Sequence, residues 1–384
     1  MTKVHLAIDG NEANIKNRVG SNVYAFKIIK ALAYLINKDK TLEATVLLAQ
    51  PPLADLPKAT PSWHYQVVKP VKFWTQFAEP LHLFLNKNKY RALFTPGHYA
   101  PRLCPIPYVS SVMDLGYLHF PNQFKTNDLL QLKNWTRYSV KSAKKIIAIS
   151  EFTKQEVINL YHRSADDVVV AYPADNLGRR PAPTAKVRAF FKKHRIGDDY
   201  FLFIGTLQPR KNLINLIKGF EIFCKENEFN YSQPQPKLVI GGKVGWLTED
   251  LLNYIEISPT KSNIILTGYI PAEIIPSLYQ HALASILIGI YEGFGIPALE
   301  SMHLGTIPIV SNNSSLPEVV GQAGLQVNPH KPEIIAEALT EVWRMPAKEH
   351  SRYKLLMKEQ IKKFSWQKSA QTILTTLKQV ALKN

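Results

Sequence analysis

The sequence predicts an α/β protein built from two doubly wound domains in tandem. Short apolar runs typical of strands alternate with longer amphipathic runs typical of helices along most of the chain. The length of 384 residues suits two domains. Residues 172–183 contain three prolines and little apolar content, so this stretch predicts a linker between the two series.

The first domain is predicted over residues 1–178. Its first strand spans residues 4–9, and a polar loop with Gly20 leads to a helix over 22–36, where apolar side chains recur at helical spacing. Further strands are predicted at 45–49, 92–95, 108–113, 145–149 and 168–171. These elements are sufficient for one complete α/β domain.

The second domain is predicted over residues 185–364, and an amphipathic helix over 365–384 follows Ser365, which is suited to N-capping. We expect this helix to pack on a domain face. The strands of the second domain are predicted at 200–204, 237–240, 263–266, 284–288 and 307–311. Doubly wound domains bind ligands at the carboxyl ends of their strands. We therefore expect the site at these ends and in the cleft between the domains.

The composition, 46% hydrophobic and 20% charged, excludes disordered and collagen-like chains. Two cysteines far apart, Cys104 and Cys224, exclude a disulfide framework and a cysteine-based zinc site. The start of the chain develops no signal-like apolar core, and no apolar run approaches the roughly 20 residues of a membrane span. We therefore expect a soluble, cytoplasmic protein.

The formal net charge of +17 favours polyanionic partners such as nucleic acid, anionic lipid or phosphorylated small molecules. A solvated basic surface without a specific partner is the alternative. Most of the positive excess lies in residues 1–180. Because the chain has no basic run interleaved with aromatic residues and no helix-turn-helix signature, we do not expect nucleic-acid binding.

Two glutamates flank the junction after the strand at 284–288. Gly293 and Gly295 permit a tight turn, Glu292 lies in the loop, and Glu300 lies in the first turns of the next helix. Two carboxylates can hydrogen-bond vicinal hydroxyls, while free amides at a helix N-terminus suit an anion. A sugar nucleotide offers both groups. The alternative is that both glutamates only cap the helix and offset its dipole.

Three further loops suit a phosphorylated ligand. Arg210 and Lys211 follow the strand at 200–204, where they could neutralise a departing diphosphate or simply form a solvated basic turn. The loop at 241–246 is rich in glycine but lacks the G-x-G-x-x-G order of dinucleotide sites. Residues 315–318 have capping-box spacing and suggest a second anion site, although such boxes usually serve only to begin helices.

Together these motifs resemble the retaining glycosyltransferases of family 4, mannosyltransferase-like group 1 enzymes with the GT-B fold. In that fold two Rossmann-like domains face a central cleft, the first on the acceptor side and the second binding the nucleotide-sugar donor. The resemblance also implies that the last helix, over 365–384, crosses back to pack on the first domain. The resemblance covers nearly the whole chain. It rests on residues 205–212, 241–246, 267–269, 292–300 and 315–321, and it extends into the first half through Gly20, residues 95–98 with His98, Asp114 and residues 149–153.

The resemblance implies a role for each matched residue. Lys211 and Arg210 would contact the donor diphosphate, and Glu300 would bind the ribose hydroxyls. The backbone at 268–270 would hold the base, and the amides at 316–319 would lie near the phosphates. The catalytic residues implied are Glu292, at the face of the transferred sugar, with Arg210, Lys211 and Asp114. The donor-binding residues implied are Gly20, Gly205, Thr206, Gly242, Lys243, Gly268, Tyr269, Gly293, Phe294, Gly295, Glu300, Leu316 and Glu318.

Two positions depart from the family pattern. Many members have arginine where this chain has Thr206, so one phosphate contact is lost or taken over by Arg210. Members also often carry histidine directly before the aspartate, where this chain has Met113 before Asp114. Because of these departures, a protein that binds sugar nucleotide without turnover is an alternative interpretation.

The resemblance leads us to expect transfer of a sugar from a GDP- or UDP-sugar to a glycan or polyprenyl-lipid-linked acceptor, with mannose as the first candidate. The chain has no D-x-D pattern, so we expect no metal and no cofactor beyond the nucleotide sugar itself. Lys141, Lys144, Lys145 and Lys154 predict contact with anionic lipid on the inner face of the cell membrane. A GT-B sugar-nucleotide epimerase is an alternative.

Overall fold

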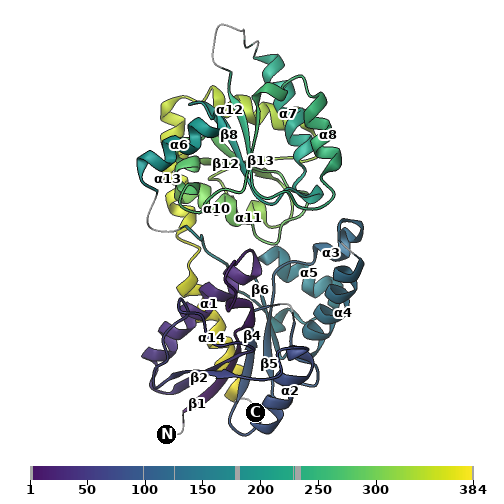
Figure 1. Ribbon diagram of the computed structural model, residues 1–384, viewed down its shortest axis with the longest axis vertical. Coiled ribbons are helices and arrows are strands. Elements are labelled where there is room, and N and C mark those ends of the chain that lie inside the picture. Colours follow the sequence, from purple (N-terminus) through teal and green to yellow (C-terminus); the bar gives the residue numbers. More distant parts are fainter. Residues whose placement is uncertain are drawn as a thin grey trace. The chain divides into compact units, whose positions relative to one another are not determined.

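The computed structural model describes residues 3–97, 99–124, 126–177, 182–227, 229 and 235–382. The chain divides into two compact units. The first consists of Met1–Pro173 with Phe364–Asn384, and the second of Ala174–Lys363. Within the described residues each unit holds one sheet in which all paired strands are parallel (Figure 1). The described part therefore has the predicted α/β architecture.

The first unit has a seven-stranded sheet in the order β3-β2-β1-β4-β5-β6-β7 among the residues described. Its strands are β1 (Val4–Asp9), β2 (Leu42–Leu48), β3 (Trp63–Val67), β4 (Ala92–Thr95), β5 (Tyr108–Val112), β6 (Lys145–Ala148) and β7 (Val168–Val170). Its helices are α1 (Ser21–Lys38), α2 (Glu79–Leu85), α3 (Gly116–His119), α4 (Thr126–Ser142), α5 (Glu151–Tyr161) and α14 (Trp366–Leu382). A π-helical turn, η2 (Trp74–Ala78), leads directly into α2.

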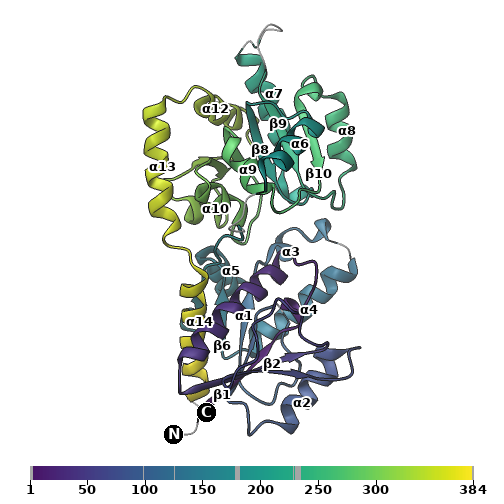
Figure 2. The ribbon, with the colours of Figure 1, turned by 60° about the vertical axis from the view of Figure 1, so that its left-hand side comes forward.

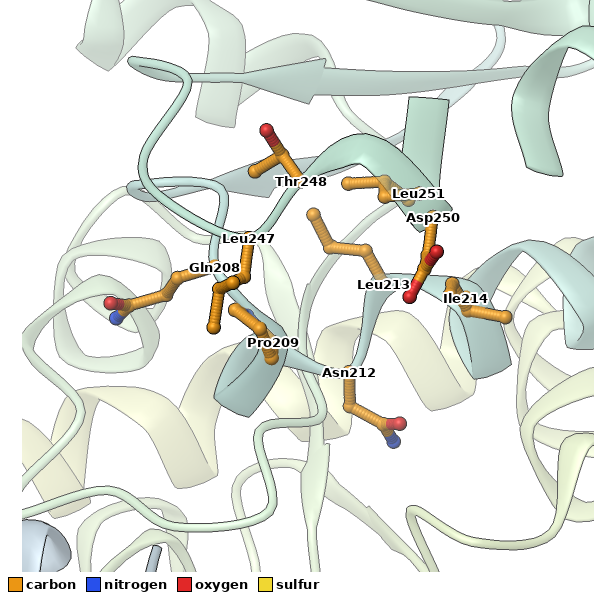
Figure 3. Close-up of a pocket in the computed structure, with 9 residues that line it drawn as sticks. All are labelled: Gln208, Pro209, Asn212, Leu213, Ile214, Leu247, Thr248, Asp250 and Leu251. Atoms are coloured by element: carbon orange, nitrogen blue, oxygen red, sulfur yellow. The ribbon is translucent and has the colours of Figure 1, made fainter. Parts of the chain in front are cut away.

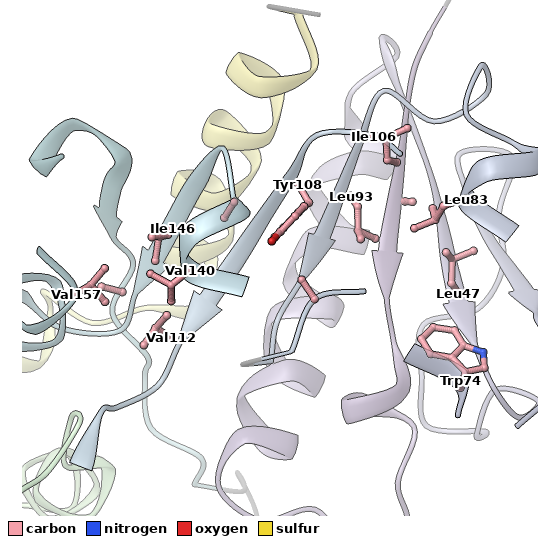
Figure 4. Packing of buried hydrophobic residues seen from close by; sticks show 14 of the residues in the cluster. Leu47, Trp74, Leu83, Leu93, Ile106, Tyr108, Val112, Val140, Ile146 and Val157 are labelled. Carbon is pink, nitrogen blue, oxygen red and sulfur yellow. The ribbon is translucent and has the colours of Figure 1, made fainter. Parts of the chain in front are cut away.

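Helices cover both faces of the first sheet. The last helix, α14, packs beside α1 and against the central strands, and Lys378 Nζ lies 2.5 Å from Asp39 Oδ2 (Figure 2). On the opposite face η2, α2, α4 and α5 bury apolar side chains against the strands (Figure 4). Trp74, Leu83 and Val140 lie in this core. Burial of apolar surface on both faces is what a parallel sheet requires.

The second unit has a six-stranded sheet in the order β10-β9-β8-β11-β12-β13 within the described residues. The strands are β8 (Tyr200–Ile204), β9 (Lys237–Gly241), β10 (Ile264–Gly268), β11 (Ala284–Leu287), β12 (Ile307–Ser311) and β13 (Leu325–Val327). The helices are α6 (Thr184–His194), α7 (Leu213–Glu226), α8 (Glu249–Ile257), α9 (Ile275–His281), α10 (Ile296–His303), α11 (Leu316–Val320), α12 (Pro332–Trp343) and α13 (Ala347–Ile361). None of the helices described in either unit is both long enough and apolar enough to cross a membrane.

Most strand predictions match the structure to within three residues at each end. Two short strands were not predicted. In β3, polar side chains interrupt the apolar ones. The strand lies at the edge of the sheet, where fewer of its side chains need to be buried. The other, β13, has only three residues. The structure divides the chain after Pro173, inside the predicted linker, whereas the predicted boundary at Gly178 lies outside the described residues.

Candidate functional site

Loops that follow neighbouring strands of the second sheet meet at its carboxyl edge. They follow β8, β9, β11 and β12. Main-chain hydrogen bonds join the first three, and side-chain hydrogen bonds join the fourth to the loop after β11. Leu207 N donates to Lys243 O at 2.9 Å, and Ile290 N donates to Arg210 O at 2.9 Å. Because ligands of doubly wound domains bind at this edge, the joined loops are the candidate site of the unit.

A buried ion pair lies within these loops. Lys211 Nζ donates to Glu292 Oε1 at 2.6 Å, and only 12% and 8% of the two side chains are exposed. Lys211 ends the short 3-10 helix η5 (Pro209–Lys211) after β8, while Glu292 lies in the loop after β11. The sequence predicted both residues as site residues, and the structure brings their side chains together. Removing one partner of such a pair leaves a buried charge, which is strongly destabilising.

Serines at the end of β12 and in the loop after it hold the loop of Glu292 in place. Glu292 N donates to Ser314 Oγ at 3.1 Å, and Ser315 Oγ lies 2.8 Å from Glu292 O and 2.9 Å from Phe294 O. Ser311 Oγ donates to Gly289 O at 2.6 Å. Sequence reasoning missed Ser311 and Ser314 and assigned Ser315 a different role, although a polar run after a buried strand is a usable signal.

The capping-box prediction for residues 315–318 is wrong in its detail. Ser315 stands at the N-terminus of α11, but its hydroxyl makes no hydrogen bond to the first turn of that helix. It bonds instead to the carbonyl groups of Glu292 and Phe294. Ser315 therefore orders the loop that carries Glu292.

Close backbone contacts explain two of the glycines. Gly242 has a φ of +141°, and a Cβ there would lie 1.9 Å from Gly205 O. At Gly289 a Cβ would lie 2.7 Å from Glu292 Oε1. The first contact lets the loops after β8 and β9 approach each other, and the second leaves room for the Glu292 carboxylate. Donor binding by Gly205 and Gly242 stays a prediction.

The other charged candidates of this unit lie around the same edge. Arg210 is half-buried next to Lys211. Glu300 is a half-buried residue of α10, and its charge contributes to the pKa of Tyr279. Burial is the main reason why the pKa of the Tyr279 phenol is raised well above its usual value, and the Glu300 carboxylate adds to this effect. Glu318 is half-buried in α11.

More exposed candidates lie on the loops after β8, β9 and β10. Thr206 is exposed. Lys243 Nζ lies 5.6 Å from the centroid of the Tyr269 ring, and Gly242 N donates to Gly268 O at 2.8 Å. The remaining predicted donor-binding residues of this unit are buried and lie in the Glu292 loop or at the start of α11, namely Gly293, Phe294, Gly295 and Leu316.

A cavity of about 150 Å³ adjoins these loops between the start of α7 and residues 247–251 (Figure 3). Its wall mixes apolar and polar side chains, among them Leu213, Leu247, Thr248 and Asp250. Gln208 also lines it, and the buried Gln208 Oε1 has no hydrogen-bond partner among the described residues. Neither Lys211 nor Glu292 lines the cavity.

The first unit holds the two remaining predicted site residues. Asp114 follows β5, is half-buried, and accepts a hydrogen bond from Gly116 N at 3.0 Å. Gly20 precedes α1 with a φ of +52° and a ψ of −119°. Met113, at the position that departs from the family pattern, is buried. His98 lies outside the described residues, and the exposed His119 pairs with Glu156.

Buried carboxyl groups near the end of β1 were not predicted. Burial, together with the nearby Glu12, raises the pKa of Asp9 to about 7, although a hydrogen bond from Asn11 N opposes this shift. Burial also raises the pKa of Glu79 well above its usual value, and Asp9 adds to the effect. Neither Glu79 oxygen has a hydrogen-bond partner among the residues described. No sequence pattern marks Glu79, because its burial depends on tertiary packing.

Within the described ranges, no three or more histidine, cysteine, aspartate or glutamate side chains cluster closely enough to hold a metal ion. Arg210, Lys211 and Lys243 are positively charged side chains on loops at the carboxyl edge of the second sheet.

Comparisons with known proteins show similarities of sequence. Residues 186–358 match the family model described as glycosyl transferases group 1. The chain is 31% identical over 275 residues to O-antigen chain mannosyltransferase B of Escherichia coli, covering 69% of this chain and 68% of that protein. It is 27% identical over 267 residues to the serotype-specific mannosyltransferase WbdA of Escherichia coli, covering 66% of this chain but 30% of WbdA.

Solved structures share the fold across nearly the whole chain. Sucrose-phosphate synthase from Thermosynechococcus elongatus has a TM-score of 0.71 at 16% identity, covering 100% of both chains. The Anabaena protein HepE, in complex with UDP and glucose, has a TM-score of 0.70 at 16% identity, covering 98% of this chain and 100% of that one. At such identities the likeness establishes the fold alone.

Proposed function

The chain belongs to the group 1 glycosyl transferases and has the GT-B fold, and on this premise we propose that it is a retaining, metal-independent hexosyltransferase. It takes a sugar from a nucleotide-diphosphate sugar and delivers it to a glycan or lipid-linked acceptor in polysaccharide biosynthesis. Mannose is the first candidate, because two of the relatives are mannosyltransferases.

The observation that carries this proposal is the buried pair of Lys211 and Glu292. The Lys211 ammonium donates to Glu292 Oε1 at 2.6 Å, so a positive charge is held within the loops of this edge. A diphosphate placed at this edge would meet the Lys211 ammonium and the Arg210 guanidinium together. Cations stabilise a leaving group most where negative charge develops in a site with little water.

The proposed reaction breaks the bond between the sugar C1 and the nucleoside diphosphate. The acceptor hydroxyl oxygen forms its bond to C1 on the same face, and its proton leaves with a phosphate oxygen of the departing nucleotide. Glu292 would hold the transferred sugar, and Glu300 would bind the ribose hydroxyls. Asp114, in the first unit, would be a further catalytic residue. The side chains of Arg210 and Lys211 would provide the positive charge that a metal ion supplies to other diphosphates.

A thermal-shift panel of UDP, GDP, ADP and their sugar conjugates tests the donor site, because a ligand that binds only the folded state raises its stability. We expect one nucleotide class to raise Tm, and we expect Lys211→Ala and Glu300→Ala to abolish the shift. Lys348→Ala, at an exposed position of α13, is the matched control and should keep it. A shift that survives Lys211→Ala would contradict the proposed site.

Product analysis tests the reaction itself. With donor and acceptor present, we expect a glycoside whose anomeric configuration matches that of the donor by NMR, in undiminished yield when a chelator is present. An inverted product would contradict retention, and loss of activity with chelator would contradict metal independence. Conversion of the donor without acceptor would instead identify an epimerase, and donor binding without any turnover would identify a non-catalytic binding protein.

A lipid-linked acceptor would lie at a membrane. We therefore also propose a peripheral contact between the protein and the anionic inner face of the cell membrane. The net charge of +17 supports this contact.

A further inference from the structure

The segment formed by η2 and α2 shows apolar side chains on both of its sides. Trp74, Ala78 and Leu83 lie in the core under the sheet and are 5%, 3% and 0% exposed. Figure 4 shows Trp74 and Leu83 in this core. Away from the sheet it presents five large apolar side chains. These are Phe73 (55% exposed), Phe77 (66%), Leu81 (59%), Phe84 (57%) and Leu85 (73%).

The five exposed side chains form one stripe. The ring centroids of Phe73, which precedes η2, and Phe77 lie 6.2 Å apart, and Leu81, Phe84 and Leu85 follow Phe77 at spacings of four, three and one residues. A helix at a protein surface normally turns polar side chains outward. Contiguous exposed apolar residues on a soluble domain mark an interaction site. We call residues 71–91 the apolar stripe segment, which includes the exposed Val71 before the stripe and the basic residues after it.

Of the lysine, arginine, aspartate and glutamate side chains in residues 68–91, every exposed one is positively charged. Lys69, Lys72, Lys87, Lys89 and Arg91 are exposed, and the only acidic residue in 68–91, Glu79, is fully buried. Lys72 Nζ lies 5.3 Å from the Phe73 ring centroid, and Lys87 Nζ lies 5.4 Å from that of Phe84. The ammonium groups therefore stand beside aromatic rings near both ends of the stripe.

The basic surface predicted from the sequence is a poorer docking surface. Lys145 Nζ lies 3.3 Å from Asp167 Oδ1, so part of its charge is already compensated. No large apolar side chain between residues 141 and 154, all of which are described, is exposed. That surface would have to bind by charge alone.

We propose that the apolar stripe segment docks on a lipid bilayer with anionic headgroups. Phe77 and Leu81 at the centre of the stripe enter the boundary between headgroups and acyl chains, while the lysines at its ends contact the headgroup phosphates. A second copy of the chain is a poor occupant, because it would present the same positive charges. The biological role of this docking, bringing the enzyme to a lipid-linked acceptor, rests on the proposed function.

Flotation of the full chain with vesicles tests the surface directly. We expect binding to vesicles that contain phosphatidylglycerol, weaker binding in high salt, and weak binding to phosphatidylcholine alone. The stripe variant Phe77→Ser/Leu81→Ser and the charge variant Lys72→Ser/Lys87→Ser should each lower the partition coefficient about tenfold or more.

Matched controls distinguish binding through the stripe from nonspecific binding to vesicles. Ile257→Ser/Leu355→Ser removes exposed apolar residues of the second unit, which are 79% and 65% exposed, and should bind vesicles like the wild type. Lys141→Ser/Lys144→Ser should do the same. Because the stripe side chains point outward, the stripe variant should keep the wild-type Tm, and an unchanged Tm shows that lost binding is not lost folding.

Several outcomes would overturn the inference. They are vesicle binding that survives both stripe and charge variants, no binding to anionic vesicles at all, and a concentration-dependent dimer that the stripe variant abolishes. A different result would contradict the proposed function. Lys211→Ala should float with anionic vesicles like the wild type while losing sugar transfer, so vesicle binding without transfer in the wild type would contradict the proposed function alone.

Discussion

The two units bury acidic side chains near the carboxyl edges of similar sheets, but they surround them differently. In the second unit, Glu292 accepts a hydrogen bond from Lys211 at 2.6 Å. In the first unit, Asp9 accepts a hydrogen bond from the neutral backbone of Asn11, and the Glu79 oxygens have no partner among the described residues. The pKa values of Asp9 and Glu79 are raised mainly by burial.

The difference teaches that the same edge of a parallel sheet can be used for two purposes. A lysine beside a buried carboxylate keeps a dipolar pair that can meet a charged ligand. Buried acids without a cation instead favour the protonated form and become neutral packing groups. The proposed function has the charged donor bind at the edge of the second unit, whereas we expect the acids of the first unit to link its stability to pH.

Breaking the buried ion pair should give the largest effect. Lys211→Met leaves Glu292 buried without its cation, so we expect the free energy of unfolding to fall by about 3–5 kcal/mol. Sugar transfer should fall by about 100-fold or more, because a cation at the leaving group is lost. Urea denaturation and initial-rate assays measure the two effects.

The double variant Lys211→Met/Glu292→Gln is the control for that experiment. Removing both charges should recover most of the stability, because no buried charge is left, but it should not recover transfer. A single variant as stable as the wild type would show that the pair contributes nothing to folding and would remove the contrast between the two units.

The contrast also marks what the sequence can predict. The strand pattern, the Arg210–Lys211 turn and the Glu292–Glu300 spacing are local, and they predicted the fold and the residues that gather at one edge of the second sheet. Two features depend instead on side chains brought together from distant segments. The Ser315 contact with the Glu292 loop joins residues 23 apart, and the burial of Glu79 follows from packing of η2 and α2 on the sheet.

The acids of the first unit should make stability depend on pH. The folded-state pKa of Asp9 is raised from 3.8 to about 7, so the folded protein keeps this proton between about pH 4 and 7 while the unfolded chain loses it. Stability from this group is therefore present at low pH and is lost as the pH rises to 7. Three pKa units correspond to about 4 kcal/mol as an upper limit, and we expect on the order of 3 kcal/mol.

Asp9→Asn should remove most of this pH dependence, measured as urea unfolding at pH 5 and pH 8. Glu79→Gln should act in the same direction, because the pKa of Glu79 is also raised. The exposed Asp250→Asn in the second unit serves as the matched control and should leave the slope unchanged. A slope that Asp9→Asn does not alter would mean that Asp9 is not the protonated group.

Two glycines with positive φ allow the same substitution to be compared in both units. Gly242→Ala would place a Cβ 1.9 Å from Gly205 O, whereas no atom lies within 4 Å of a Cβ at Gly20. Gly20→Ala should cost about 1–3 kcal/mol from backbone strain alone. Gly242→Ala should cost about 2 kcal/mol more, because the neighbouring backbone must also move. Thermal unfolding measures both, and equal losses would contradict a close contact between the loops.

The smallest effect is expected from an exposed ion pair of the first unit. Arg18 lies 2.5 Å from Asp55 Oδ2 and 3.9 Å from the Phe26 ring centroid, but the Asp55 side chain is 54% exposed. Arg18 lowers the pKa of Asp55, so this contribution is present at neutral pH and is lost as the pH falls below about 4, opposite to Asp9. Because solvent screens the pair, Arg18→Ala should cost only about 0.5–1 kcal/mol at pH 7, and less in high salt. A loss as large as that of Lys211→Met would show that burial is not what separates the two pairs.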